Sequence, residues 1–151
     1  MTESLRVLLV EDNPGDADLT RAGLEKSQFP IELTVLASGT EAVAFIQRKG
    51  KFADEPRPDL VLLDLNLPGV DGQYVLSEIK RNDEMKRVPV SILTSSSAES
   101  DVARSYELGA NSYVVKPFDF KNHQSIVRAV EEFWFRVVKL PPRVAPCSTG
   151  N

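Results

Sequence analysis

The chain has 151 residues, the usual size of one compact domain. Its 18 basic and 22 acidic residues give a formal net charge of −4, without a long block of like charge, so nucleic acid is disfavoured as the main partner. One cysteine and one histidine exclude a disulfide framework, a cysteine-rich zinc site and a multi-histidine metal site. An acidic first segment and the lack of an apolar run of about 18 residues predict a cytoplasmic protein without a membrane span.

Short runs rich in leucine and β-branched residues predict five β-strands. Their ranges are 5–10, 31–36, 60–65, 88–93 and 112–115. The first and third runs are almost entirely apolar, which is typical of central strands buried on both faces of a parallel sheet. The second and fifth runs are more polar or shorter.

The first two helices have recognisable starts. Asn13 and Pro14 open a helix whose apolar face is weak. Ser38 and Glu41 fit a capping box, in which the serine accepts from a backbone N–H and the glutamate reaches back to the cap. We expect this second helix to end at Gly50.

Apolar spacing predicts three further helices. The third lies around 75–79, and the fourth spans about 102–108 and stops at Gly109, where glycine accepts a left-handed conformation. The fourth has a predicted apolar face of Val102, Ala103, Tyr106 and Leu108. The last helix begins near Asp119, and its predicted buried stripe consists of Ile126, Val127, Val130, Phe133, Trp134 and Val137, with Phe135 on the other side.

Strands that alternate with helices predict an α/β fold with a doubly wound, five-stranded parallel sheet. At this size the flavodoxin-like strand order 2-1-3-4-5 fits best. In such sheets ligands bind at the carboxyl ends of the strands, beside the point where the strand order reverses. We expect a domain over 4–138 and a C-terminal tail over 139–151 that holds no output domain.

The residues that leave the strands in this order carry complementary chemistry. They are Glu11 and Asp12, Asp64, Thr94 and Lys116. Carboxylates brought close together repel one another unless a cation compensates them, and Mg²⁺ and the lysine ammonium are suitable cations. Asp64 is then placed to attack a phosphoryl donor in line, while the Thr94 hydroxyl donates to the phosphoryl oxygens.

Four motifs give the chain a resemblance to the receiver domain of two-component response regulators over residues 4–138. They are Glu11-Asp12, Asp64 followed by residues 67–72, Thr94-Ser95 and Lys116-Pro117-Phe118. The resemblance implies that Asp64 accepts a phosphoryl group from the phosphohistidine of a sensor histidine kinase. It implies that Glu11, Asp12, Asp64 and the backbone carbonyl of Asn66 hold Mg²⁺ or Mn²⁺, while Thr94 and Lys116 bind the phosphoryl group. Glu11 stands where an aspartate is commoner.

The resemblance also implies a signalling switch rather than an enzyme. Thr94 and Tyr113 occupy the positions of the receiver switch residues. The fourth helix, fifth strand and fifth helix form the output surface in receivers, which implies a homodimer that signals by protein contact. Apolar groups outside the main stripe make Phe135, Leu140 and Pro141 candidate interface residues. The equal alternative for Phe135 is that its ring covers the edge of the sheet or packs under the tail.

A narrower resemblance is to the small stand-alone response regulators paired with bacterial phytochrome kinases. It is carried by residues 11–16, the loop 49–58 and the C-terminal segments 133–135 and 140–142. The implied kinase partner is therefore a phytochrome.

Three other readings remain open. A haloacid dehalogenase-like, Mg²⁺-dependent phosphatase also uses an aspartate nucleophile, but it needs a general-acid aspartate where this chain has Asn66. A flavodoxin-like flavin protein conflicts with Glu11 and Asp12, which would repel a phosphate. A receiver-like interaction module without phosphorylation would not need the acceptor, acidic pair, threonine and lysine that are all present. His123 is expected to be an exposed residue of the last helix.

Overall fold

A computed structural model of the chain describes residues 4–143, apart from the Phe120 side chain. Its five parallel strands are ordered β2-β1-β3-β4-β5, which confirms the predicted fold and strand order. The strands are β1 (Leu5–Val10), β2 (Ile31–Leu36), β3 (Leu60–Leu63), β4 (Val90–Thr94) and β5 (Ser112–Val115). The third strand ends two residues earlier than predicted, and the fourth runs from Val90 to Thr94.

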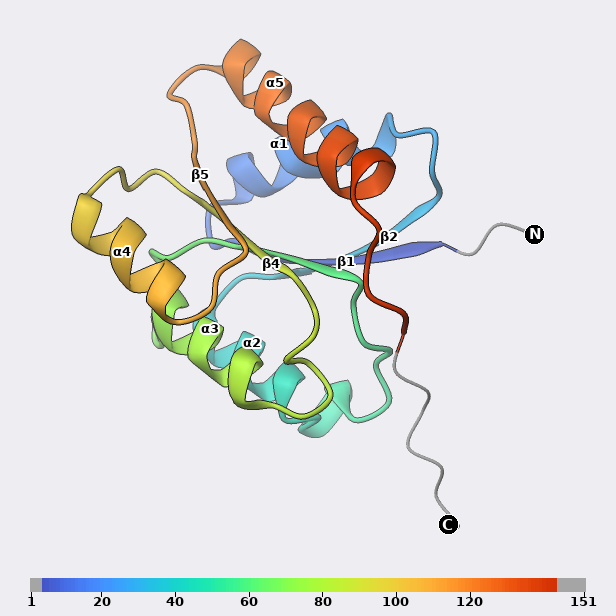
Figure 1. The fold of residues 1–151 in the computed structure, drawn as a ribbon, viewed down its shortest axis with the longest axis vertical. Helices are drawn as coiled ribbons and strands as arrows, with labels where there is room; N and C mark the ends of the chain where they lie inside the picture. Colours follow the sequence, from blue (N-terminus) through green and yellow to red (C-terminus); the bar gives the residue numbers. More distant parts are fainter. Residues whose placement is uncertain (1–3, 144–151) are drawn as a thin grey trace.

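Helices cover both faces of the sheet (Figure 1). They are α1 (Pro14–Glu25), α2 (Gly39–Ile46), α3 (Gly72–Arg81), α4 (Glu99–Glu107) and α5 (Phe120–Glu131), with a 3₁₀ turn η1 (Gly50–Phe52) and a π-helical segment η2 (Glu132–Val137). Helices α1 and α5 lie on one face, and α2, α3 and α4 lie toward the other (Figure 1). None of the helices in the described range is long and apolar enough to cross a bilayer.

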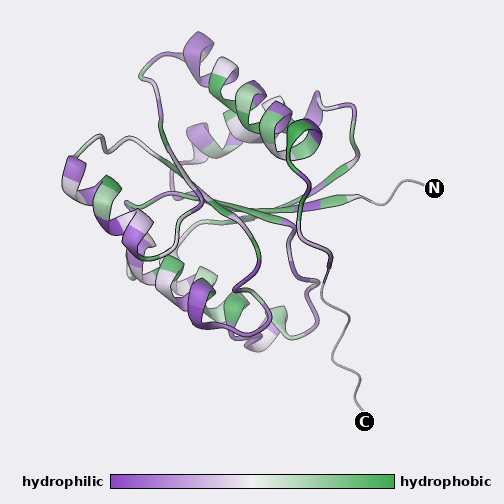
Figure 2. Cartoon of the chain, in the orientation of Figure 1, coloured by the Kyte–Doolittle hydropathy of each residue, from purple (hydrophilic) through white to green (hydrophobic). Residues whose placement is uncertain are grey.

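The sheet separates two apolar cores. Leu8 and Val10 of β1 face the core beneath α2 and α3, whereas Val7 and Leu9 face the core beneath α1 and α5. This alternation follows from the two-residue period of a strand. Apolar colour runs along the sheet and the helix sides that face it (Figure 2). Packing on both faces fixes the register of the strands. The carboxyl ends of the strands therefore have fixed positions relative to one another.

Side-chain caps confirm several predicted helix starts. Asn13, Ser38 and Asp119 accept hydrogen bonds from the backbone N–H groups of Asp16, Glu41 and Asn122, and Asp71 caps α3 in the same way. The Glu41 carboxylate accepts from the N–H of Ala37, one residue before the cap.

The second helix ends earlier than predicted. Its last residue is Ile46 rather than Lys49, and Arg48 takes a left-handed conformation with φ 56°. The guanidinium of Arg48 donates to the carbonyl oxygens of Ala53 and Glu55 and to the Glu84 carboxylate, so this residue ties the following loop together. These long-range bonds compensate for a backbone conformation that glycine usually takes.

The predicted apolar face of α4 is wrong in part. Ala103 and Tyr106 are exposed, Val102 is half-buried, and Ser105 is fully buried. The helix contacts β5 and α3. Apolar spacing therefore identified Val102 and Leu108, which are half-buried, but it wrongly included Ala103 and Tyr106 and missed Ser105.

The predicted stripe of the last helix is correct for some of its residues only. Val127, Val130 and Trp134 are buried, but Phe133 and Val137 are 48% and 68% exposed. The cause is η2, because a π-helical turn contains about one more residue than an α-helical turn and rotates the side chains after it about the helix axis.

Phe135 turns toward the protein as a result. Its side chain packs against the core beneath α1 and α5, and its ring meets Phe29 edge to face with centroids 6.4 Å apart. The expectation that Phe135 lies opposite the buried stripe is therefore wrong.

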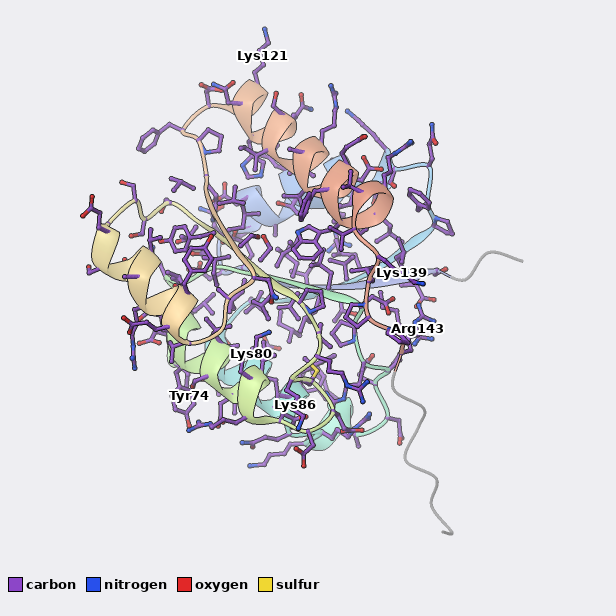
Figure 3. All side chains as sticks on the ribbon, viewed as in Figure 1. Tyr74, Lys80, Lys86, Lys121, Lys139 and Arg143 are labelled. Atoms are coloured by element: carbon purple, nitrogen blue, oxygen red, sulfur yellow. The ribbon has the colours of Figure 1, made fainter. Side chains whose placement is uncertain are left out.

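The first residues after the last helix also contact the domain. Leu140 packs against the same core as Phe135. The guanidinium of Arg143 pairs with the Asp59 carboxylate at 2.8 and 3.0 Å and donates to the carbonyl of Ser4. Arg143 thus lies beside the amino end of β1 (Figure 3). The rest of the predicted tail, 144–151, lies outside the described residues, and the boundary at 138 remains a prediction.

Candidate functional site

The carboxyl ends of four strands meet at one edge of the sheet. Val10 pairs with Leu63, so Glu11 and Asp64 leave neighbouring strands side by side. Thr94 closes β4 and Lys116 follows β5. The four side chains are buried, and Asp12 is exposed beside them. The structure therefore brings together the residues that the strand order predicted.

The Lys116 ammonium lies at the centre of this group. It donates to Glu11 Oε1 at 2.7 Å, to Asp16 Oδ2 at 2.9 Å and to Asp64 Oδ2 at 3.0 Å. An ammonium has three N–H donors, so these contacts use all of them. Such charge-assisted bonds are the strong ones among protein hydrogen bonds. They fix the lysine against the predicted phosphoacceptor.

Oxygen atoms of Glu11, Asp12 and Asp64 lie within 4.8 Å of one another. Three carboxylates form a hard donor set that suits Mg²⁺ or Mn²⁺. The residues present therefore fit the implied metal. The N–H of Asn66 donates to Asp64 Oδ1 at 3.1 Å, whereas the role of its carbonyl as a ligand stays a prediction.

The pKa values of the two buried acids shift in opposite directions. Burial, aided by the neighbouring Asp64 carboxylate, raises the pKa of Glu11 to about 7 although Lys116 opposes the change. Burial also acts to raise the pKa of Asp64, but hydrogen bonds from Glu11, the Asn66 N–H and Lys116 outweigh it and hold that pKa below its ordinary value. These contacts thus favour the ionised form of Asp64, which is the form that a nucleophile requires.

The pKa of Lys116 is raised. Burial opposes this direction, and the bonds to Glu11, Asp16 and Asp64 overcome it. The lysine stays charged at neutral pH. A fixed positive charge beside the Asp64 oxygen is what a developing phosphoryl anion requires.

Gly72 permits the close turn that carries Asp64. A Cβ at this position would overlap the carbonyl oxygen of Asp64 and lie 2.5 Å from Leu65 Cα. The Gly72 N–H donates to the carbonyl of Leu65 at 2.9 Å. The start of α3 therefore packs directly on the backbone that presents the acceptor, and a side chain would displace it.

Thr94 and Tyr113 are connected through one residue. Thr94 is completely buried, and the Ser96 N–H lies 3.5 Å from its Oγ1. The Tyr113 hydroxyl donates to the carbonyl of Ser96 at 2.9 Å. The half-buried Tyr113 ring packs against the core beneath α2 and α3. The switch role of these two residues stays a prediction.

Two residues differ from the sequence-based expectations. Asp16 is absent from the predicted site, although it accepts a hydrogen bond from Lys116; the available signal was an acid in the first turn of the helix that Asn13 and Pro14 open. His123 was expected to be exposed, but it is only 3% exposed and its Nε2 lies 3.4 Å from Thr20 Oγ1. His123 lies on the side of α5 that packs against α1, which explains its burial.

The predicted interface residues lie far along the chain from these strand ends. Phe135, Leu140 and Pro141 are half-buried, and the first two pack against the core beneath α1 and α5. Part of their apolar surface is therefore already used within the domain. Their role in an interface stays a prediction.

Comparison with known proteins agrees with this geometry. The model of the response regulator receiver domain matches residues 7–128. Response regulator Rcp1 of Synechocystis sp. is 46% identical over 135 residues, covering 89% of this chain and 92% of Rcp1. Its Mn²⁺-bound crystal structure superposes with a TM-score of 0.88 at 45% identity, covering 91% of this chain and 99% of the other.

Two further structures are similar. The phosphorylated cyanobacterial phytochrome response regulator RcpA has a TM-score of 0.90 at 41% identity, covering 93% of this chain and all of that chain. The receiver domain of sensor histidine kinase PA1611 from Pseudomonas aeruginosa, with magnesium in its active-site cleft, has a TM-score of 0.66 at 31% identity, covering 84% and 97% of the two chains. The chain therefore belongs to the response regulator receiver family, whose members generally act as non-enzymatic signalling switches.

Proposed function

We propose that this protein is a phosphorylation-gated switch whose acceptor is Asp64. The Asp64 carboxylate oxygen attacks the phosphorus of a phosphohistidine or small-molecule donor. A new O–P bond forms, and the bond from phosphorus to the leaving group breaks, with its electron pair going to the leaving group. The observation that carries the proposal is the Lys116 ammonium 3.0 Å from Asp64 Oδ2, in a buried site beside two further acids.

Each surrounding residue has a role in this reaction. Glu11, Asp12, Asp64 and the Asn66 carbonyl would hold Mg²⁺ or Mn²⁺, which supplies positive charge against the transferred group. Lys116 donates to a phosphoryl oxygen, and the Thr94 hydroxyl donates to another. Asn66 provides no carboxylate that could act as a general base and activate water for rapid hydrolysis of the aspartyl phosphate. The protein therefore loses the group slowly, as a timed switch requires.

The output is a change of protein contacts. Phosphorylation adds charge and strong acceptor oxygens at the strand ends, and the response is a preference for one of two arrangements. Thr94 and Tyr113 transmit this preference through Ser96 toward α4 and β5. We propose a homodimer as the result, and a phytochrome sensor histidine kinase as the donor because RcpA is a phytochrome response regulator.

Intact mass measurement tests the acceptor. Incubation with acetyl phosphate and Mg²⁺ should add one HPO₃ group to the native chain and none to Asp64→Asn. Circular dichroism should show that the variant keeps the fold. Uptake by Asp64→Asn, or no uptake by the folded native chain, would contradict the proposal.

Light scattering tests the output. Phosphorylation of the native chain should move the mass from monomer toward dimer. Lys116→Ala should break this link, so that any remaining phosphorylation produces no change in mass. An unchanged phosphate-dependent shift in Lys116→Ala would count against a role for the lysine in signalling.

A further inference from the structure

Asp16 is a third carboxylate on the Lys116 ammonium, and neither motif spacing nor the resemblance to receivers assigned it a role. It lies in the first turn of α1, and its side chain is 33% exposed. Its Oδ2 accepts from Lys116 Nζ at 2.9 Å, about the same length as the 3.0 Å bond from the same ammonium to Asp64. Asp16 therefore has a contact with Lys116 at least as close as that of the phosphoacceptor.

The three acceptors of Lys116 differ in what else they can bind. Glu11 and Asp64 belong to the group of oxygens that can hold a metal, and Asp16 does not. Metal binding and phosphorylation thus change the charge around Glu11 and Asp64, whereas the Asp16 carboxylate binds neither group. Asp16 is the acceptor that continues to attract the ammonium.

A phosphoryl group on Asp64 needs a hydrogen-bond donor, but Lys116 has no unused N–H group. All three N–H groups are already directed at carboxylates, so one must turn to the new oxygen. Packing holds the lysine side chain, which is 6% exposed, so its position does not depend on Asp16 alone. What Asp16 adds is negative charge beside the site where a phosphoryl anion must enter.

Resting on the proposed function, we infer that Asp16 is a positioning residue that competes with the phosphoryl group for the Lys116 ammonium and slows phosphorylation of Asp64 by anionic donors. Its removal frees the ammonium and lowers repulsion of the donor. The alternative is that Asp16 only stabilises α1, because an acid in the first turn interacts favourably with the helix dipole. Asp18 provides the matched control, since it is an exposed acid of the same helix.

The experiment compares Asp16→Asn with Asp18→Asn, using acetyl phosphate and Mg²⁺. The second-order rate constant for HPO₃ uptake should rise about 3- to 10-fold in Asp16→Asn. This is the effect expected from removing one unit charge several ångströms away, at an effective dielectric constant between those of the protein interior and water. It should stay within about twofold of native in Asp18→Asn, whose exposed charge is screened. The gain should be smaller with phosphoramidate, which carries less negative charge than acetyl phosphate.

Two further measurements separate this role from a structural one. In metal-free protein, the NMR signal of the Lys116 Nζ group should move in Asp16→Asn and not in Asp18→Asn. In a Lys116→Ala background only the repulsion of the donor remains to be relieved, so Asp16→Asn should increase the rate by a clearly smaller factor than in the native background. An unmoved Nζ signal, a gain that is undiminished without Lys116, or equal rates in the two asparagine variants would each overturn the inference.

These failures differ from failure of the proposed function. If the native chain takes up no phosphoryl group, or Asp64→Asn still does, the acceptor assignment is wrong. If Asp64 is phosphorylated normally and Asp16→Asn behaves as Asp18→Asn does, only the role of Asp16 is wrong. Asp16→Glu, which keeps the charge, should remain close to the native rate and confirms that the site tolerates substitution.

Discussion

The Tyr113 hydroxyl donates a hydrogen bond to the backbone carbonyl of Ser96 at 2.9 Å, two residues beyond the buried Thr94. The bond joins β5 to the loop between β4 and α4. Burial raises the pKa of Tyr113, so the hydroxyl keeps its proton and its ability to donate. The bond thus links the Tyr113 ring to the segment that directly follows Thr94.

Tyr113→Phe should cost about 0.5–1.5 kcal/mol of unfolding free energy, the net value of one such hydrogen bond. Phosphoryl uptake should stay at the native level, because Tyr113 does not contact Asp64. Urea unfolding measures the cost, and Tyr106→Phe serves as the control at an exposed position. An equal cost in both variants would argue that the bond to Ser96 contributes nothing.

The pKa of His123 should lie below its ordinary value of 6.5. Burial lowers it and the charge of Lys116 acts in the same direction, while the Asp16 carboxylate opposes them. The unfolded chain binds a proton on His123 near pH 6.5, whereas the folded chain binds it only at a lower pH. The contribution of neutral His123 to stability is therefore fully present above pH 6.5. It is lost as the pH falls from 6.5 through the lower folded value.

An NMR titration of the imidazole measures this directly, because His123 is the sole histidine in the chain. Urea-denatured protein provides the reference midpoint. A folded midpoint above the denatured one would contradict the direction. His123→Asn should remove this part of the pH dependence of stability.

The π-helical segment gives Phe133 and Phe135 different environments, so their removal should have different effects on stability. Phe135→Ala should cost about 1–3 kcal/mol, because a half-buried ring that contacts Phe29 is lost. Phe133→Ala is the same chemical change at a more exposed ring and should cost less. Chemical denaturation of both variants tests the order. The reverse order would indicate a regular α-helix through this segment.

The ion pair between Arg143 and Asp59 should contribute to stability. Arg143→Gln should lower the unfolding free energy by about 1–2 kcal/mol, since two charge-assisted bonds to a largely buried carboxylate are lost. Burial would raise the pKa of Asp59, but Arg143 and Arg6 outweigh it and lower the pKa. The contribution is therefore present above the ordinary value of 3.8 and disappears as the pH falls through the folded value.

Arg104→Gln is the matched control for this pair. Its partner Glu107 lies 3.9 Å away and both side chains are exposed, so the change should stay within about 0.5 kcal/mol. Thermal or urea unfolding at neutral pH compares the two variants. Equal effects would show that the C-terminal segment gains nothing from Arg143.

The central part of the site was predictable because it depends on backbone direction. Glu11, Asp64 and Lys116 all follow parallel strands, and the strand order follows from the alternation of strands and helices. A pattern of residue types therefore sufficed to bring these side chains to one edge. The same holds for Thr94, which ends β4.

The remaining features depend on packing that periodicity does not contain. A π-helical turn within 132–137 changes which side chains face the core, and a strict 100° period cannot register it. The bond of Asp16 depends on how far the Lys116 side chain reaches across to α1. The burial of His123 depends on how closely α5 lies against α1.

The most direct test of the account is the chemical identity of residue 64 after phosphorylation. Borohydride reduces an aspartyl phosphate to homoserine, which fragmentation mass spectrometry locates in the sequence. The account predicts homoserine at position 64 in protein treated with acetyl phosphate and Mg²⁺, and aspartate there in untreated protein. Homoserine at Asp12 or elsewhere, or HPO₃ uptake that leaves residue 64 as aspartate, would contradict it.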